Sequence, residues 1–199
     1  MSTITITPHG KFVVKAGHVG DAFVARLFSE KPKAFRGHIL ESSGSTCIEA
    51  TEQVIADFDR AMAIARASRR LDSITGAEVP TRFEFETVLR MIDIPEHTVA
   101  LLGKLLAASA NQITVEDFAR VCQLASARDV IDCLEKLGVA ICGELECEVP
   151  AGMRHYMMLR IPTGEFPKDA ARLDLQPEFL ETLSVLHQRG QKAQSSRAA

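Results

Sequence analysis

The sequence predicts an α+β protein that begins with a βββα domain and continues as a second domain rich in helices. Two observations support this. Residues 4–40 contain runs in which apolar and polar side chains alternate, as in strands that bury one face. From residue 47 onward, apolar side chains recur at the spacing of amphipathic helices. We therefore expect an N-terminal domain over residues 1–72, a linker over 73–81 and a C-terminal domain over 82–190.

Three strands are expected in the N-terminal domain. The first alternating run covers residues 4–14, with a turn at Pro8–Gly10, and the other two cover 22–28 and 35–40. The segment Ser43–Ser45 then breaks the pattern, because glycine and small polar residues favour turns.

A long helix is predicted to follow, from about residue 47 to residue 70. Thr46 and Glu49 fit a capping box, in which a hydroxyl and a carboxylate bond the free amides at a helix start. The helix ends in three arginines, which suit the negative end of a helix dipole. Its apolar face contains Val54, Phe58, Ala61, Met62 and Ala65.

The C-terminal domain is expected to start with helices over residues 82–92 and 96–109. Thr114 is then placed to cap one helix and Ser126 to cap the next, with a turn at 123–126 between them. The helix after Ser126 has an apolar stripe formed by Ala127, Val130, Leu134 and Leu137.

Two alternating stretches follow Gly138. Residues 144–149 and 155–161 are expected to pair as a hairpin around residues 150–154. A further amphipathic helix is predicted over 177–187, and the polar segment 191–199 is expected to be a disordered tail.

The order of helix, turn, helix and hairpin over residues 96–161 resembles the winged helix-turn-helix superfamily. The resemblance implies a winged-helix domain with flanking helices at 82–92 and 177–187, which commonly build a homodimer in such regulators. The sequence equally permits these helices to fold back on the same chain. The resemblance also implies double-stranded DNA as the partner, bound in the major groove by the second helix of the motif. The residues expected to contact DNA are Arg120, Ser126, Arg128, Lys136, Arg154 and Arg160.

The charges of the motif favour a second interpretation. Its second helix presents more acids than bases on the expected exposed face, and the stretch 144–149 places a glutamate at every other position. Phosphates repel such side chains. The alternative function is therefore an adaptor or inhibitor, antitoxin-like or from a phage or mobile element, that binds a basic protein surface. The acids expected to contact this partner are Asp129, Asp132, Glu144, Glu146 and Glu148.

The N-terminal domain resembles the HicB-type antitoxin fold in two short segments. These are Ala25–Phe28 and Gly44–Ala50, the latter matching a Gly-x-Thr-x-x-Glu-Ala helix start. The Pro-Asp-Leu-Pro-Gly stretch of that family is replaced by Ser29–Lys33. The resemblance implies a partner-binding N-terminal domain joined to a DNA-binding C-terminal domain.

The remaining sequence features limit the classes of function. The chain has a net charge of -3, so nucleic-acid binding requires a local basic patch. It lacks an apolar run long enough for a membrane span, and its five cysteines indicate reduced thiols and a cytoplasmic location. Cys142, Cys147 and His155 lack the short spacing of most structural zinc sites, so neither a metal nor another cofactor is expected. A nucleophile elbow and a phosphate-binding loop are also missing, and we expect no catalysis.

Overall fold

The N-terminal part of the protein is a four-stranded antiparallel sheet in the order β1-β2-β3-β4. The computed structural model describes residues 4–30, 34–109, 113–160 and 172–198. Two-residue turns join the first three strands, and Gly10 and Gly20 adopt the positive φ angles, 58° and 61°, that such turns require. The strands are β1 (Thr5–His9), β2 (Phe12–Val19), β3 (Ala22–Ser29) and β4 (Leu40–Gly44).

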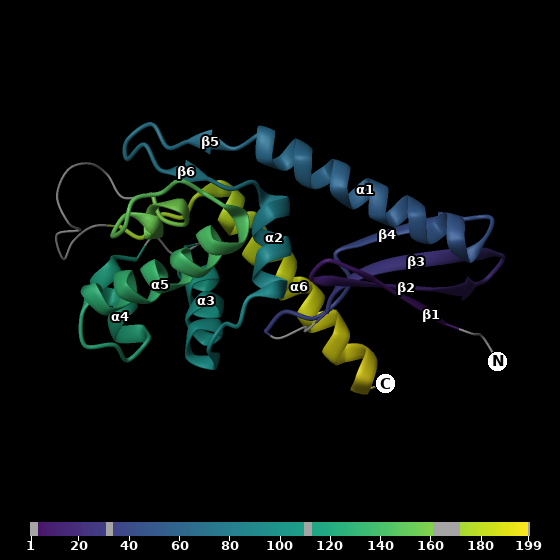
Figure 1. The fold of residues 1–199 in the computed structure, drawn as a ribbon. Helices are drawn as coiled ribbons and strands as arrows, with labels where there is room; N and C mark the ends of the chain where they lie inside the picture. The colour runs from purple at the N-terminus through teal and green to yellow at the C-terminus, as the bar shows by residue number, and fades with distance from the viewer. Residues whose placement is uncertain (1–3, 31–33, 110–112, 161–171, 199) are drawn as a thin grey trace.

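Helix α1 (Cys47–Ala67) covers one face of this sheet (Figure 1). Thr46 caps it through a hydrogen bond from the Glu49 amide, as the sequence predicts. Gly44 lies so close to the Ala50 amide that a Cβ atom would approach it to 2.7 Å, which lets the chain turn directly from β4 into α1. The buried side chains between sheet and helix are Val14, Ala16, Ala25, Leu27, Ile39, Ala50, Val54 and Phe58.

A larger core lies in the helical part that follows. Figure 1 shows these helices on the side of the molecule away from the N-terminus. Its central element is α2, which is buried along most of its length and packs against α1, α5 and α6. The elements are β5 (Arg70–Leu71), β6 (Glu78–Val79), α2 (Arg82–Met91), α3 (Glu96–Ser109), α4 (Val115–Val121), α5 (Ala127–Leu145), the short 3-10 helix η1 (Arg154–Met157) and α6 (Pro177–Ala198).

The strand predicted over 22–28 is confirmed as β3, whereas the predictions for 4–14 and 35–40 are wrong in strand number or position. The run 4–14 forms two strands, because Gly10 and Lys11 make a tight turn and Pro8 belongs to β1. The run 35–40 contributes only Leu40 to a strand, and β4 instead continues through Ser43, which was expected to break it. Pairing with β3 explains this, since Gly44 lies opposite Phe23 in the sheet register.

The expected linker over 73–81 is an ordered hairpin. The buried Asp72 carboxylate accepts hydrogen bonds from the amides of Ile74 and Thr75 and from the Thr75 hydroxyl. Strands β5 and β6 pair on either side of this turn, and Ala77 and Val79 enter the larger core.

The expected wing over 144–149 and 155–161 is the main error of the sequence prediction. Helix α5 continues through Leu145, and Arg154–Met157 is a 3-10 helix where a strand was expected. The apolar stripe of α5 also continues past Leu137 through Ile141 and Leu145, so helical periodicity prevails over the alternation of the glutamates. Residue 161 lies outside the described residues.

The flanking helices fold back on the same chain. Helix α2 packs along α6, where Phe85 and Phe179 are both fully buried with ring centroids 5.1 Å apart. These faces are therefore not exposed for a dimer contact. Helix α6 extends from Pro177 to Ala198, well beyond the expected 177–187 and into the segment that was expected to be a tail.

Candidate functional site

Helices α4 and α5 keep the helix-turn-helix order that the sequence predicts. Thr114 caps α4 by accepting a hydrogen bond from the Asp117 amide at 3.0 Å. At the start of α5 the Asp129 carboxylate accepts from both the amide and the hydroxyl of Ser126. Gln123 has a left-handed φ of 59° in the turn between the helices. Local capping thus fixes the two helix starts on which the motif depends.

One side of α5 is exposed along the whole helix. Arg128, Asp132, Lys136, Val139 and Gly143 follow one another at three- or four-residue spacing and share this side. The core contacts of α5 lie on the opposite side, and the segment around η1 packs on the neighbouring side. A ligand of the helix-turn-helix would therefore meet this exposed side.

The arginines expected to bind DNA form ion pairs within the chain. Arg120 pairs with Asp117 at 2.7 Å, and Arg128 pairs with Asp132 at 2.8 Å. These two pairs are exposed, so they hold their partners weakly and can exchange for phosphate. Lys136 is exposed on the same side of α5 as Arg128.

The other two arginines that were expected to contact DNA lie outside α4 and α5. Arg154 is half-buried and 3.6 Å from Glu135, on the side of α5 that η1 covers. Arg160 is 4.0 Å from Asp174 in the segment before α6. Within the described residues, the expected hairpin of 144–149 with 155–161 does not form, and Leu159 instead bridges Leu175 in an antiparallel pair.

The Glu135 carboxylate holds the η1 segment against α5. It accepts hydrogen bonds from the amides of Gly152 and His155 and from the His155 ring at 3.1 Å. Burial lowers the pKa of His155, although Glu135 acts in the opposite direction. Burial by itself would raise the pKa of Glu135, but the hydrogen bonds from His155 and Gly152 outweigh it and the pKa is lowered. From the sequence, Glu135 is predicted only as an exposed charge on this helix.

Most of the acids proposed to bind a basic partner bind groups of this chain. Asp129 belongs to the cap of α5, and Asp132 pairs with Arg128. Glu144 pairs with Lys11 at 2.7 Å, and Glu146 pairs with Arg66 at 3.1 Å. Both of these basic partners come from the N-terminal part, so the two ion pairs link the end of α5 and the residue after it to the sheet and to α1.

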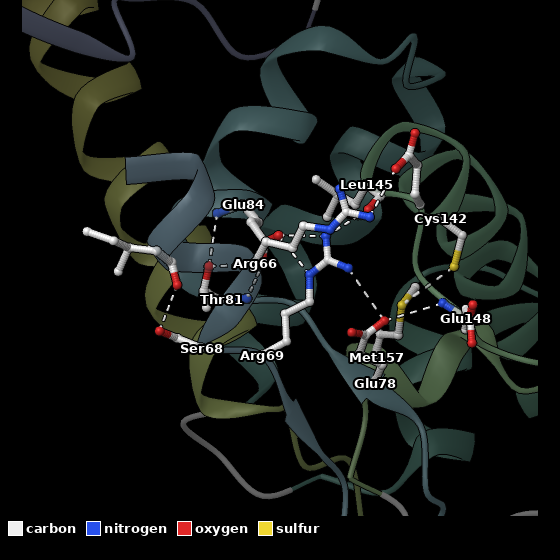
Figure 2. Close-up of polar contacts among 12 residues, drawn as sticks. Arg66, Ser68, Arg69, Glu78, Thr81, Glu84, Cys142, Leu145, Glu148 and Met157 are labelled. Carbon is white, nitrogen blue, oxygen red and sulfur yellow. Dashed lines mark hydrogen bonds and ion pairs between the residues drawn. The ribbon is translucent and has the colours of Figure 1, made fainter. Parts of the chain in front are cut away.

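Glu148 lies at the border of a buried polar cluster centred on Arg69 (Figure 2). The Arg69 guanidinium bonds the Glu84 carboxylate, lies 3.5 Å from Glu78 and donates to the Leu145 carbonyl at 2.7 Å. Glu84 is fully buried and also accepts from Thr81 at the cap of α2. Burial lowers the pKa of Arg69, but its hydrogen bond to Glu84 and the charges of the groups around it together outweigh burial, and the pKa is raised.

Sequence reasoning placed Arg69 at a helix end and missed this cluster. The available signal was the Thr81-x-x-Glu84 spacing of a capping box, which puts a carboxylate at the start of α2. The cluster saturates its own donors and acceptors, so its role is to join α1, α2 and the end of α5.

Two adjoining cavities lie at this junction. The polar one has a volume of about 400 Å³ and is lined by Arg66, Arg69, Glu84, Glu144 and Glu146 together with Met62, Ala63 and Leu145. The apolar one has a volume of about 220 Å³ and is lined by Lys11, Phe12, Phe58, Met62, Thr87, Val88, Met91, Glu144 and Leu145. The sequence pattern gave no sign of either, because their walls come from segments far apart in the chain.

The cysteines do not assemble a metal site within the described ranges, where no group of three possible ligands is found. Cys142 contacts the Met157 sulfur at 3.8 Å. A hydrogen bond from the Cys147 thiol lowers the pKa of Cys142, and the same bond together with burial raises the pKa of Cys147. Among the helices of the described residues, none is long and apolar enough to cross a membrane.

Comparison with known proteins does not place this site in a family. No family model matches the chain, and no curated protein and no solved structure matches it.

Proposed function

We propose that the protein binds double-stranded DNA through the exposed side of α5, as a non-catalytic regulator. The observation that carries the proposal is the capped α4–turn–α5 unit, with Arg120, Arg128 and Lys136 exposed on it. A helix-turn-helix places its second helix in the major groove. Basic side chains exposed at the start of that helix contact the DNA phosphates and the edges of the nucleobases.

The charges on α5 set the expected strength of this binding. Each phosphate contact lowers the logarithm of the association constant by about 0.9 per decade of salt, so three bases predict a slope of roughly -3. Asp117 and Asp132 lie beside two of these bases and repel phosphate. The proposed DNA binding is therefore modest in affinity and steeply lost as salt rises.

A fluorescence-polarisation titration of labelled duplex DNA at several salt concentrations tests the proposal. The double variant Arg128→Ala with Lys136→Ala is expected to weaken binding and reduce the slope by about two. Asp132→Asn is expected to tighten binding, because it removes a repelled charge and leaves the helix capped.

Lys15→Ala with Arg26→Ala is the matched control, since it removes the same charge from the sheet at the other end of the molecule. Equal losses from the two double variants would show that binding follows net charge and would contradict a role of α5. Absence of binding at low salt would refute the function itself.

A second candidate function, protein binding, is favoured by the open face of the sheet. Ile6 and Val19 are exposed by 62% and 54%, and Val13, Val24 and Phe28 are only half-buried on the same face. Apolar side chains gathered on one face are typical of protein-binding surfaces. This face replaces the acids of α5 as the proposed adaptor surface, because Glu144 and Glu146 are paired within the chain.

Sedimentation at increasing protein concentration tests whether a second copy of the chain occupies this face. A dimer that Ile6→Lys dissociates, and that Ile48→Lys on the exposed side of α1 leaves intact, would support protein binding through the sheet. A monomer at all concentrations would exclude a second copy as the partner.

A further inference from the structure

Two cysteines meet at the end of α5. The helix ends at Leu145, and Glu146 after it adopts the left-handed backbone angles φ 53° and ψ 43°. Such a residue turns the chain back, so the side chain that follows it packs on the last helical turn. Cys147 follows Glu146, and its thiol donates a hydrogen bond to the Cys142 sulfur. Because the two sulfurs already touch, a disulfide between them requires little movement of the backbone.

The surroundings of Cys142 favour its thiolate. The Cys147 thiol donates to the Cys142 sulfur, and the Arg154 guanidinium donates to it as well and places a positive charge beside it. These contacts lower the pKa of Cys142, although burial acts in the opposite direction. The same bond between the thiols, together with burial, raises the pKa of Cys147. Since the thiolate is the reactive form of cysteine, Cys142 is the nucleophile of the pair.

The pair can be reached from solvent. Cys142 and Cys147 are only half-buried, and the positions around them are exposed, namely Gly143, Glu146 and Glu148. A Cβ atom at Gly143 would meet nothing within 4 Å, so this part of the helix surface is open. A small oxidant can therefore approach the Cys142 sulfur in the folded protein.

We propose that Cys142 and Cys147 form a reversible oxidation site, which a hydroperoxide converts to a disulfide. The disulfide would covalently close the turn at Glu146, whose carboxylate pairs with Arg66 of α1. This inference does not depend on DNA binding, and the chemical state of the thiols tests it separately.

The reaction has two steps. The Cys142 thiolate attacks one peroxide oxygen, an S–O bond forms as the O–O bond breaks, and the released oxygen takes up a proton. The peroxide is thereby reduced by two electrons, and Cys142 is oxidised to a sulfenic acid. The Cys147 sulfur then attacks the Cys142 sulfur, and the S–O bond breaks as the S–S bond forms. The proton of the Cys147 thiol leaves with the oxygen as water.

Treatment of the reduced protein with one equivalent of hydrogen peroxide tests the proposal. Two of the five thiols are expected to be lost, and dithiothreitol should restore both. Trypsin releases residues 137–154 as one peptide that contains both cysteines, and this peptide should become lighter by two hydrogen atoms. Cleavage after Glu144 and Glu146 then separates Cys142 from Cys147 unless a disulfide joins them.

Serine variants separate the two steps. Cys147→Ser is expected to stop the reaction at the sulfenic acid of Cys142, which dimedone labels, because the second thiol is missing. Cys142→Ser is expected to lose the fast reaction with peroxide. Cys133→Ser is the matched control, since it makes the same change earlier in α5 and should form the disulfide at the wild-type rate.

Arg154→Gln tests the origin of the reactivity. It is expected to shift the pH profile of Cys142 oxidation to higher pH, because the positive charge beside the sulfur is lost. A role of Arg154 in structure alone would leave that profile in place.

Three results would overturn the proposal. The first is that peroxide is consumed while the peptide 137–154 keeps both thiols. The second is that the disulfides join other cysteines or two copies of the chain. The third is that dithiothreitol does not restore the thiols, since oxidation would then have passed to the sulfinic acid. An equal rate of disulfide formation in concentrated urea would likewise contradict a role of the folded turn.

Discussion

Two glycines of α5 differ in what a side chain would meet. A Cβ atom at Gly138 would approach the Arg154 Cβ to 2.7 Å and the Arg154 carbonyl oxygen to 2.9 Å, whereas a Cβ at Gly143 meets nothing within 4 Å. Gly138 thus permits the close contact between α5 and η1, and Gly143 only leaves the helix backbone less restrained.

Gly138→Ala is expected to lower the free energy of unfolding by about 1–3 kcal/mol, because the backbone of the η1 segment must move. Gly143→Ala is expected to raise it by about 0.5–1 kcal/mol, since alanine favours a helix more than glycine does. Urea denaturation of each variant measures its free energy of unfolding relative to the wild type. A destabilising Gly143→Ala would contradict a helix that continues to Leu145.

Histidine 155 makes stability depend on pH. Burial lowers its pKa below the ordinary value of 6.5, so below that pH the unfolded chain gains a proton that the folded protein does not take up. Stability is therefore lost as the pH falls from 6.5 toward the lowered pKa of the folded protein. Glu135 acts in the same direction at lower pH, because its pKa is lowered from 4.5 and its contribution disappears as the carboxylate is protonated.

His155→Gln is expected to lose less stability than the wild type between roughly pH 7.5 and pH 5.5, where an ordinary histidine titrates. Urea midpoints at the two pH values give the comparison. Burial also lowers the pKa of His38. Because His38 is present in both proteins, its contribution to the pH dependence of stability cancels in the comparison. His97→Gln is the control, since His97 is exposed on α3. An unchanged pH dependence in His155→Gln would show that His155 is not the group responsible.

At the scale of elements, the start of α2 depends on one buried carboxylate. Glu84 completes the capping box with Thr81 and pairs with Arg69, whose side chain is only 5% exposed. Removal of Glu84 leaves the buried Arg69 charge with only the more distant Glu78 as an acidic partner, which is more costly than removal of both Arg69 and Glu84.

Glu84→Ala is expected to lower the free energy of unfolding by about 3–5 kcal/mol. The double variant Arg69→Met with Glu84→Leu is expected to recover most of this loss, because neither charge then remains in the interior. Thermal and urea unfolding of the two variants provide the measurement, with Glu52→Ala on the exposed side of α1 as the control. If the double variant were less stable than Glu84→Ala, the loss would come from packing rather than from an unpaired charge.

Helices were easier to predict from this sequence than strands, for a physical reason. Helix starts leave local signals, such as Thr46 with Glu49 and Ser126 with Asp129, and the structure keeps both. The alternation of the glutamates at 144–148 is local as well, but it competes with an apolar stripe that ends at Leu145. The choice between the two depends on packing against α2, which the local pattern does not contain.

The candidate sites were less predictable because their partners are distant in the sequence. The exposed Arg128 and Lys136 follow from helix spacing alone. The pairing of Lys11 with Glu144 joins residues 133 positions apart, and only the folded chain brings them together.

At the scale of the whole molecule, the two parts are joined by contacts of several kinds. Met62 packs against both cores, and Arg66 and Arg69 connect the end of α1 to the end of α5. Arg70 connects the β5–β6 hairpin to α6, by hydrogen bonds to Gln176 and Glu178 at 2.6–2.9 Å. The segment over 73–81, which was expected to be a linker, joins the same junction through Glu78, which lies 3.5 Å from Arg69.

These contacts predict that the sheet and the helices unfold together. The sheet core is small, with eight buried apolar residues against one helix, and would be marginal by itself. Phe28→Trp places a fluorescent probe on the sheet of a protein that has no tryptophan, while circular dichroism follows mainly the helices. Both signals are expected to give the same urea midpoint.

Lys11→Glu should shift the two midpoints downward together, and Lys11→Glu with Glu144→Lys should restore them, because the pair is re-formed with reversed charges. Two separate midpoints in the single Phe28→Trp protein would mean that the interface contributes little, and that the two parts are independent folding units.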